Sequence, residues 1–192
     1  MKFKYEGKKN IDTVLARYSV ASDCGQLGKK AEVVARYAIT GKIERCHTAG
    51  DTDCVVKRGV VVEVKTGAGE LEPFGYDTKE AAIEAMEAGR FLLGCSHVAY
   101  LPRYNGHNIE QTLVVPRKRF ISLLQKYNLI RVKQATNGAW KVTIQNYLPT
   151  ENFHPSKDRA FLFLDDLEKY GLFLDCFCEK MLGRELFDVE GR

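Results

Sequence analysis

The feature that most constrains this chain is a short run rich in valine, Val60-Val61-Val62-Glu63-Val64-Lys65. Side chains branched at Cβ pack well on a pleated surface, and a near-continuous apolar run is typical of a strand that is buried on both faces. The preceding segment, Asp53-Cys54-Val55-Val56, has a similar character, and Lys57-Arg58-Gly59 between the two suits a turn. We therefore expect a β-hairpin whose second arm is a central strand of a sheet.

Helical and strand patterns alternate on both sides of this hairpin. The spacing of apolar residues predicts a helix over residues 24–40. Helices are also predicted over residues 78–93 and 117–127, the last of them opened by Pro116. Asp23 and Asp77 are the expected N-caps of the first two helices, and Gly41 and Gly94 are their expected stops. Strands are predicted over residues 96–104, 107–115, 129–134 and 139–146, with Asn-Gly turns at 105–106 and 137–138. This order predicts an α/β fold.

The pattern changes after Pro149. Residues 156–182 are helical in character and rich in Phe and Leu, and Gly171 is expected to break or bend this stretch. A chain of 192 residues suits one domain with an appendage. We expect residues 1–148 to form the main domain, and residues 149–192 to form a helical extension that packs on it or serves as the surface of a homodimer.

Composition narrows the functional classes. The N-terminus lacks the apolar stretch of a signal peptide, and no run of ~18 apolar residues could span a bilayer, which predicts a cytoplasmic protein without a membrane partner. The net charge of +4 permits nucleic-acid binding but does not imply it. Cys46-His47 followed by Cys54 is a poor zinc site because no second ligand pair follows, so reduced thiols are expected.

Charged side chains at the end of the valine run carry the candidate chemistry. Side chains alternate along a strand, so Glu63 and Lys65 share one face. If the turn is a three-residue loop ending in a left-handed glycine, Asp53 lies opposite Glu63 with Cβ atoms ~5 Å apart, and Asp51 lies opposite Lys65. With a two-residue loop, Asp53 would meet Val64 and the charged group would scatter.

In the first register, two carboxylates face each other and repel. A divalent cation removes that repulsion, and hard oxygen ligands suit Mg²⁺ or Mn²⁺. Lys65 can orient or help to deprotonate a metal-bound water, or it can stabilise charge that develops on a phosphate. Asp53, Glu63 and Lys65 around a metal therefore suit phosphodiester hydrolysis.

With these residues, the sequence resembles the PD-(D/E)xK nuclease superfamily. The resemblance lies in Asp53-Cys54-Val55-Val56, a short turn and Val61-Val62-Glu63-Val64-Lys65, within a stretch from residue 25 to 101. Helix, hairpin, helix and strand follow there in the family's order. The resemblance implies a restriction-endonuclease-like core and a Mg²⁺-dependent nuclease, acting on DNA in restriction, recombination or mobile-element settings and more as an endonuclease than as an exonuclease. The proline of the family name is absent, since Thr52 precedes Asp53.

The resemblance also implies roles for individual residues. Asp53, Glu63 and the backbone carbonyl of Val64 bind Mg²⁺, for which Mn²⁺ can substitute, and Lys65 assists catalysis. Glu32, on the preceding helix, supports this site or forms a second metal position. The alternative for Glu32 is a solvated glutamate paired with Arg36 four residues on. Asp51 replaces Asp53 as ligand if the register slips by two residues.

Two groups of basic residues are candidate contacts with nucleic acid: Lys29 and Lys30, and the cluster Arg117, Lys118 and Arg119. Positive charge at a helix N-terminus is unfavourable, so the cluster is a candidate phosphate contact; an ordinary charged surface is the alternative for both groups. Two other functions stay open. One is a non-catalytic nucleic-acid-binding or assembly module with the same fold, and the other is an interaction protein in which Asp51, Glu63 and Lys65 form a surface ion-pair ladder.

Overall fold

The valine run forms β2 (Val61–Thr66), an inner strand of a mixed sheet in the computed structural model. The structure describes residues 27–40, 54–55, 60–67, 69–72, 74–102, 111–145 and 156–183. Within them the sheet has the order β1-β2-β3-β4-β7, where the other strands are β1 (Cys54–Val55), β3 (His97–Leu101), β4 (Leu113–Pro116) and β7 (Leu172–Phe173). β2 and β3 are parallel, and the other neighbours are antiparallel. The predicted α/β class is confirmed at this level.

The β1–β2 hairpin has the register that a three-residue loop predicts. Cys54 lies opposite Val62 and Val55 lies opposite Val61. A two-residue loop would have placed Cys54 opposite Glu63, so the described register excludes it. Continued by one position, the observed register assigns Asp53 to Glu63. Asp53 and Asp51 lie outside the described residues, and their pairing stays a prediction.

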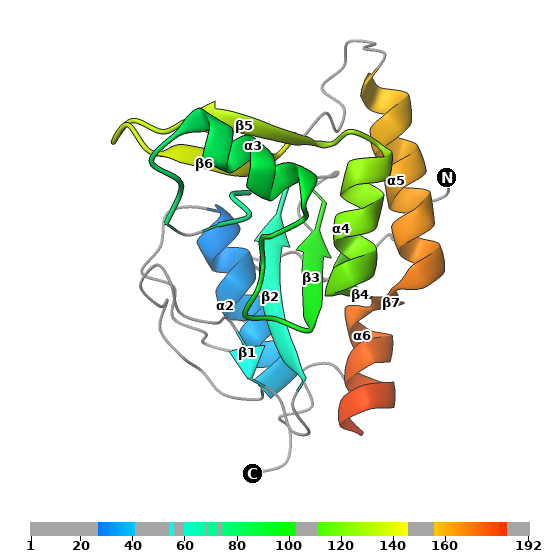
Figure 1. Ribbon diagram of the computed structural model, residues 1–192. Coiled ribbons are helices and arrows are strands. Elements are labelled where there is room, and N and C mark those ends of the chain that lie inside the picture. The colour runs from blue at the N-terminus through cyan, green and yellow to red at the C-terminus, as the bar shows by residue number, and fades with distance from the viewer. Residues whose placement is uncertain are drawn as a thin grey trace.

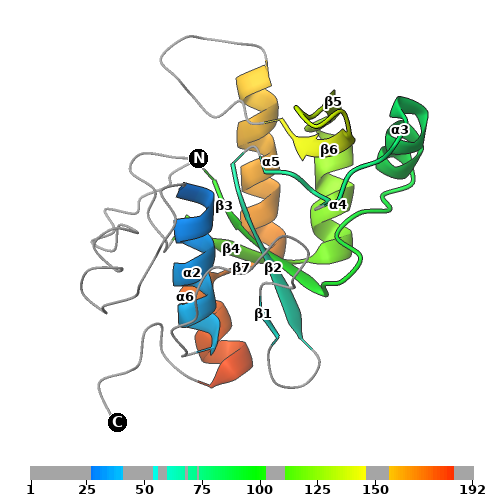
Figure 2. The same ribbon diagram turned by 90° about the vertical axis from the view of Figure 1, so that its left-hand side faces the viewer.

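Helices cover both faces of the sheet (Figure 1). Figure 2 shows α2 and α6 on one side of β2, and α3 and α4 on the other. The helices are α2 (Leu27–Thr40), α3 (Lys79–Glu87), α4 (Arg117–Lys126), α5 (Ser156–Tyr170) and α6 (Leu174–Phe177), which continues into the π-helical turn η3 (Cys178–Leu182). No helix among the described residues combines the length and the apolar character needed to cross a bilayer.

Two hydrophobic cores, one on each face, fix which way the side chains of β2 point. Val62 and Val64 pack with α2, α6 and η3 in the first core. Val61 borders the second core, where Val98 and Tyr100 of β3 meet α4 and α5. Because side chains alternate along a strand, Glu63 and Lys65 project on the side of the second core, away from α2.

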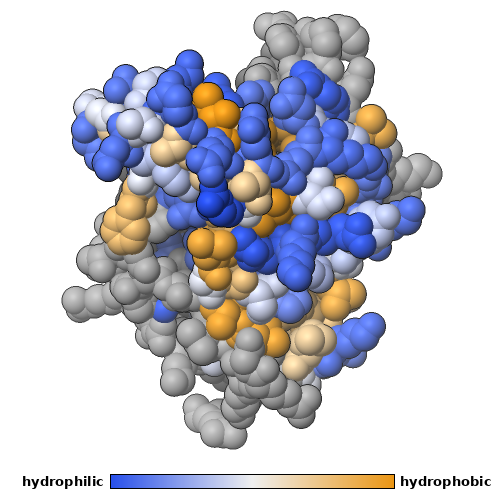
Figure 3. Space-filling view, in the orientation of Figure 1, coloured by the Kyte–Doolittle hydropathy of each residue, from blue (hydrophilic) through white to orange (hydrophobic). Residues whose placement is uncertain are grey.

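A second, smaller sheet lies against α3. It consists of β5 (Ile130–Gln134) and β6 (Trp140–Ile144), and the turn between them holds Gly138 at a φ of 86°. The predicted hairpin is thus confirmed, with its Asn137-Gly138 turn. Figure 3 shows that the surface over α3 and this hairpin is mostly hydrophilic.

Two predicted boundaries are wrong at α3. The N-cap is Thr78 rather than Asp77, since the Thr78 side chain accepts a 3.2 Å hydrogen bond from the amide of Ala81. The helix ends at Glu87 instead of continuing toward Gly94. Gly89 turns the chain with a φ of 62°, a left-handed conformation that glycine adopts readily. Phe91 and Leu92, which follow it, are buried without being helical, and this explains why the apolar pattern suggested a longer helix.

The C-terminal half differs from prediction in two places. β3 and β4 pair as expected, and Tyr100 lies opposite Leu113. A two-residue turn at Asn105-Gly106 would instead have placed Tyr100 opposite Gln111, so the observed register is displaced by two residues. That turn lies outside the described residues. Gly171 breaks the helical stretch as predicted, and the chain then adds β7 to the edge of the sheet beside β4. This two-residue strand was not predicted, because it is too short to show alternation.

Candidate active site

Strand β2 holds Glu63 and Lys65 in direct contact. Lys65 Nζ lies 2.6 Å from Glu63 Oε1, and the two side chains are only 16% and 19% exposed, Lys65 being the less exposed. An ion pair on an open surface is screened by water and salt, whereas a shielded pair keeps more of its attraction. The two residues are therefore not part of an exposed ion-pair ladder.

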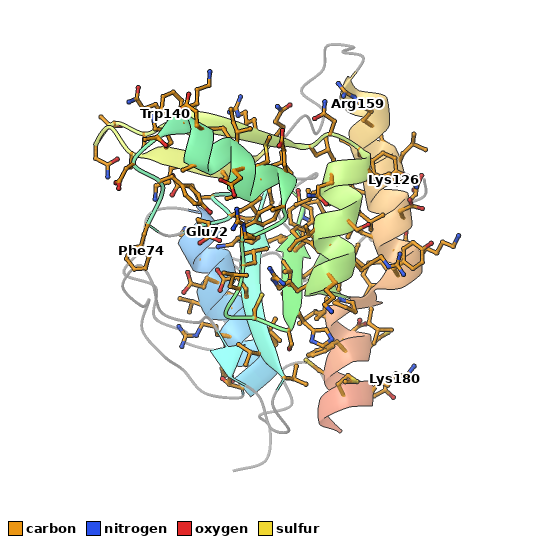
Figure 4. The ribbon with its side chains drawn as sticks, viewed as in Figure 1. Glu72, Phe74, Lys126, Trp140, Arg159 and Lys180 are labelled. Atoms are coloured by element: carbon orange, nitrogen blue, oxygen red, sulfur yellow. The ribbon has the colours of Figure 1, made fainter. Side chains whose placement is uncertain are left out.

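A further acidic side chain, Glu72, lies in the segment after β2 (Figure 4). Its carboxyl group is half-buried, and Oε1 accepts a 3.0 Å hydrogen bond from the amide of Leu92. Burial raises the pKa of Glu72 above its ordinary value, while the Leu92 hydrogen bond and the charges of Lys65 and Arg117 oppose the rise and the charge of Glu63 adds to it. Glu72 thus shares the electrostatic environment of Glu63 and Lys65. Sequence reasoning missed it, since no motif spacing marks it.

The segment that carries Glu72 is held by the β5–β6 hairpin. The amide of Ile144 donates to the carbonyl of Gly69 at 3.0 Å, and the amide of Leu71 donates to the carbonyl of Val142 at 2.8 Å. Farther along, Tyr76 and Trp140 exchange backbone hydrogen bonds of 2.7 and 2.8 Å. Backbone pairing at both ends fixes the path of the chain, and with it the position of Glu72.

The loop between α3 and β3 passes in front of β2 (Figure 1). Leu92, at its centre, has a φ of 57°, an unusual conformation for a bulky side chain. Its side chain is buried, and its carbonyl accepts from the amide of Cys95 at 3.4 Å. Strained residues of this kind persist only where their surroundings hold them, and they are concentrated at functional sites.

Arg117 holds the same loop from the other side. Its guanidinium donates to the carbonyl of Phe91, at 3.1 Å from Nε and 2.5 Å from one terminal nitrogen, and to that of Gly89 at 3.4 Å. Lys118 and Arg119 instead have exposed side chains, and the Arg119 guanidinium lies 4.3 Å from the ring centre of Tyr170. The predicted phosphate-contact cluster is therefore divided: Arg117 supports the loop, and the other two face solvent.

The remaining predicted residues lie on α2. The Glu32 carboxylate is 3.7 Å from Arg36, and its side chain is 20% exposed. The core that α2 forms with Val62 and Val64 lies on one side of β2 (Figure 2), and whether Glu32 reaches Glu63 and Lys65 stays a prediction. The ion pair with Arg36 is the alternative considered for this residue. Lys30 is partly exposed on the same helix, and the side chain of Lys29 lies outside the described part.

The described residues supply only part of the predicted metal site. Glu63 and the carbonyl of Val64 are hard oxygen ligands that suit Mg²⁺. Among the described residues, no three or more His, Cys, Asp or Glu side chains are arranged to hold a metal ion. The donor set thus fits Mg²⁺ only if Asp53, which lies outside the described residues, joins it. Among the described residues, Cys95, Cys176 and Cys178 are in the thiol form and make no disulfide.

No family model, no curated protein and no solved structure matches this chain. The resemblance to the nuclease superfamily therefore rests on the hairpin residues and on the order of the elements.

Proposed function

We propose that this protein is a metal-dependent nuclease that hydrolyses phosphodiester bonds in DNA. The observation that carries the proposal is the shielded Glu63–Lys65 contact of 2.6 Å. The described hairpin register, Cys54 opposite Val62, supports it, because the same register continued by one pair predicts Asp53 opposite Glu63. If Asp53 joins Glu63 and Lys65, two carboxylates and an ammonium group provide ligands for a divalent cation and a positive charge beside it. That combination suits reactions in which negative charge develops on a phosphate.

In this proposal Asp53, Glu63 and the carbonyl of Val64 hold Mg²⁺ or Mn²⁺. The bound ion would supply the charge that polarises the phosphate and lowers the pKa of a water molecule. Lys65 directs its ammonium group at the oxygen on which charge develops, or orients the attacking water. The shielding of Lys65 strengthens this interaction, because electrostatic forces are larger where water is excluded.

The second candidate is a nucleic-acid-binding or assembly module without catalysis. The observation that favours it is the exposure of the side chains of Lys118 and Arg119 in the first turn of α4. In that case the Glu63–Lys65 pair would stabilise the strand and Lys118 and Arg119 would contact phosphates. The two candidates differ in whether a divalent cation acts at Glu63.

The proposal is tested by incubating the protein with Mg²⁺ or Mn²⁺ and a substrate panel: supercoiled plasmid, linear duplex, single strand, four-way junction and RNA. Glu63→Ala and Lys65→Ala should each lose cleavage by ~10²-fold or more, the scale on which a transition-state contact acts. Asp77→Ala and Lys79→Ala are matched controls, because Asp77-Thr78-Lys79 repeats the acid-x-Lys pattern with exposed side chains. These controls should cleave like wild type. If no substrate is cleaved but metal-independent binding persists, the second candidate is correct.

A further inference from the structure

The turn that follows β2 runs close beside the Lys65 side chain. A Cβ atom at Gly69 would lie 3.7 Å from Lys65 Cδ and 3.3 Å from the carbonyl oxygen of Thr66, so the backbone of Gly69 passes next to the stem of the lysine. The Lys65 side chain is only 16% exposed, whereas lysine is usually among the most exposed residues. This segment, the β2 turn (Gly67 and Gly69), thus forms one wall around Lys65.

Tyr100 on β3 ties the β2 turn to the sheet. Lys65 and Tyr100 are partners in the parallel register of β2 and β3, and both side chains project on the side of the second core. The Tyr100 hydroxyl donates a 3.3 Å hydrogen bond to the carbonyl of Gly67. At the other end, the carbonyl of Gly69 accepts from the amide of Ile144 at 3.0 Å. The turn is therefore held at Gly67 by β3 and at Gly69 by β6.

The Tyr100 ring is itself held firmly by its neighbours. It is 2% exposed, and the ring centres of Phe120 and Phe163 lie 5.5 and 5.8 Å from its own. A ring packed in this way points its hydroxyl in one direction, and a buried hydroxyl needs a hydrogen-bond partner. The bond to Gly67 therefore fixes the turn relative to the core, and with it the wall beside Lys65.

We propose that Tyr100 is a positioning residue for Lys65 and acts through the β2 turn. The ion pair with Glu63 would not keep the ammonium group in place by itself, because lysine has a flexible stem and Glu63 is a metal ligand in the proposed function. A wall beside the stem restricts the ammonium group to the side of Glu63, whatever that carboxylate binds. The catalytic meaning of this inference rests on the proposed nuclease function, while the positioning itself is a property of the fold.

Chemical labelling of lysine tests the positioning without metal or nucleic acid. Reductive methylation followed by mass spectrometry would give the rate at each lysine of wild type, Tyr100→Phe and Tyr127→Phe. Tyr100→Phe removes the hydroxyl and keeps the packed ring. Labelling of Lys65 should then rise by roughly 2- to 10-fold, the effect of one lost hydrogen bond on a local opening equilibrium. Lys118, which is exposed, should react equally in all three proteins.

Tyr127→Phe is the matched control. It removes a tyrosine hydroxyl that donates a 2.6 Å hydrogen bond to Asp166 on α5 instead of to the β2 turn, so Lys65 should be labelled as in wild type. Lys141, whose side chain is 8% exposed on β6, reports a general loosening of the fold. An unchanged rate at Lys65 in Tyr100→Phe, or an equal rise at Lys65 and Lys141, would overturn the inference.

Cleavage kinetics connect the positioning to the proposed function. Tyr100→Phe should lower kcat by roughly 2- to 10-fold and leave KM unchanged, because a displaced ammonium group affects the transition state more than substrate binding. An unchanged kcat despite faster labelling of Lys65 would overturn the positioning role. If wild type cleaves no substrate, the proposed nuclease function is wrong instead, and the labelling result stands as a property of the fold.

Discussion

The amide of Leu92 donates a 3.0 Å hydrogen bond to the Glu72 carboxylate, and this bond joins the segment after β2 to the loop before β3. Replacing Glu72 with alanine leaves a partly buried amide without its acceptor, so we expect the free energy of unfolding to fall by about 1–3 kcal/mol. Glu72→Gln keeps an acceptor oxygen, so its free energy of unfolding should fall by less than that of Glu72→Ala. Urea denaturation at neutral pH measures both variants, and equal losses would show that the hydrogen bond does not stabilise the fold.

The protonation of Glu72 should also make stability depend on pH. Burial raises the pKa of Glu72, so the folded protein holds this proton more tightly than the unfolded chain does. The resulting stabilisation is complete below the ordinary pKa of 4.5 and is lost as the pH rises through the higher pKa of the folded protein. The unfolding free energy of wild type minus that of Glu72→Gln should therefore decrease from pH 4.5 toward neutral pH. Denaturation curves across this range measure the difference, and an increase would contradict the burial of Glu72.

The cap of α3 provides a test of local structure. Because the Thr78 hydroxyl accepts from the amide of Ala81, Thr78→Ala should lower the free energy of unfolding by ~1 kcal/mol. Asp77→Ala removes an exposed side chain that does not cap the helix and should change it by less than about 0.5 kcal/mol. Thermal or urea unfolding of the two variants gives the comparison. If Asp77→Ala lowered the free energy of unfolding more than Thr78→Ala does, Asp77 would be the cap instead.

Arg117 and Lys118 are neighbours in sequence with different expected roles. Arg117→Ala removes the donors that hold the carbonyls of Gly89 and Phe91, so stability should fall by about 1–3 kcal/mol. Lys118→Ala should leave stability nearly unchanged. If Lys118 contacts a phosphate, this variant should make the slope of log binding constant against log salt concentration shallower by about one unit. Binding titrations at several salt concentrations measure that slope. An unchanged slope would remove Lys118 from the contact surface.

The parts of the fold that could be predicted are those that local chemistry determines. The valines of β2 were sufficient to predict the hairpin, and the glycine of its turn favoured the observed register over the one that a two-residue loop would give. Pro116 marks the start of α4, and Asn137-Gly138 marks the β5–β6 turn, because each residue type suits the backbone found there.

What the sequence could not show depends on contacts between distant segments. The contact between Glu72 and Leu92 joins residues that are 20 positions apart, and it depends on the paths of two irregular segments. The order of elements placed Glu32 on a helix before the hairpin, but it could not show which face of the sheet that helix covers. Arg117 looked like a phosphate contact by its charge, and only the folded loop reveals the carbonyls that it holds.

The central claim is that Glu63 and Asp53 share one divalent cation, and binding of Mn²⁺ tests it most directly. Electron paramagnetic resonance or calorimetry would measure the affinity for Mn²⁺ in wild type and in four alanine variants, at Asp53, Glu63, Asp51 and Glu32. We expect binding to wild type, loss in Asp53→Ala and Glu63→Ala, and affinity like that of wild type in Asp51→Ala and Glu32→Ala. If wild type and Glu63→Ala bind Mn²⁺ equally, the metal site is not at β2 and the account is wrong.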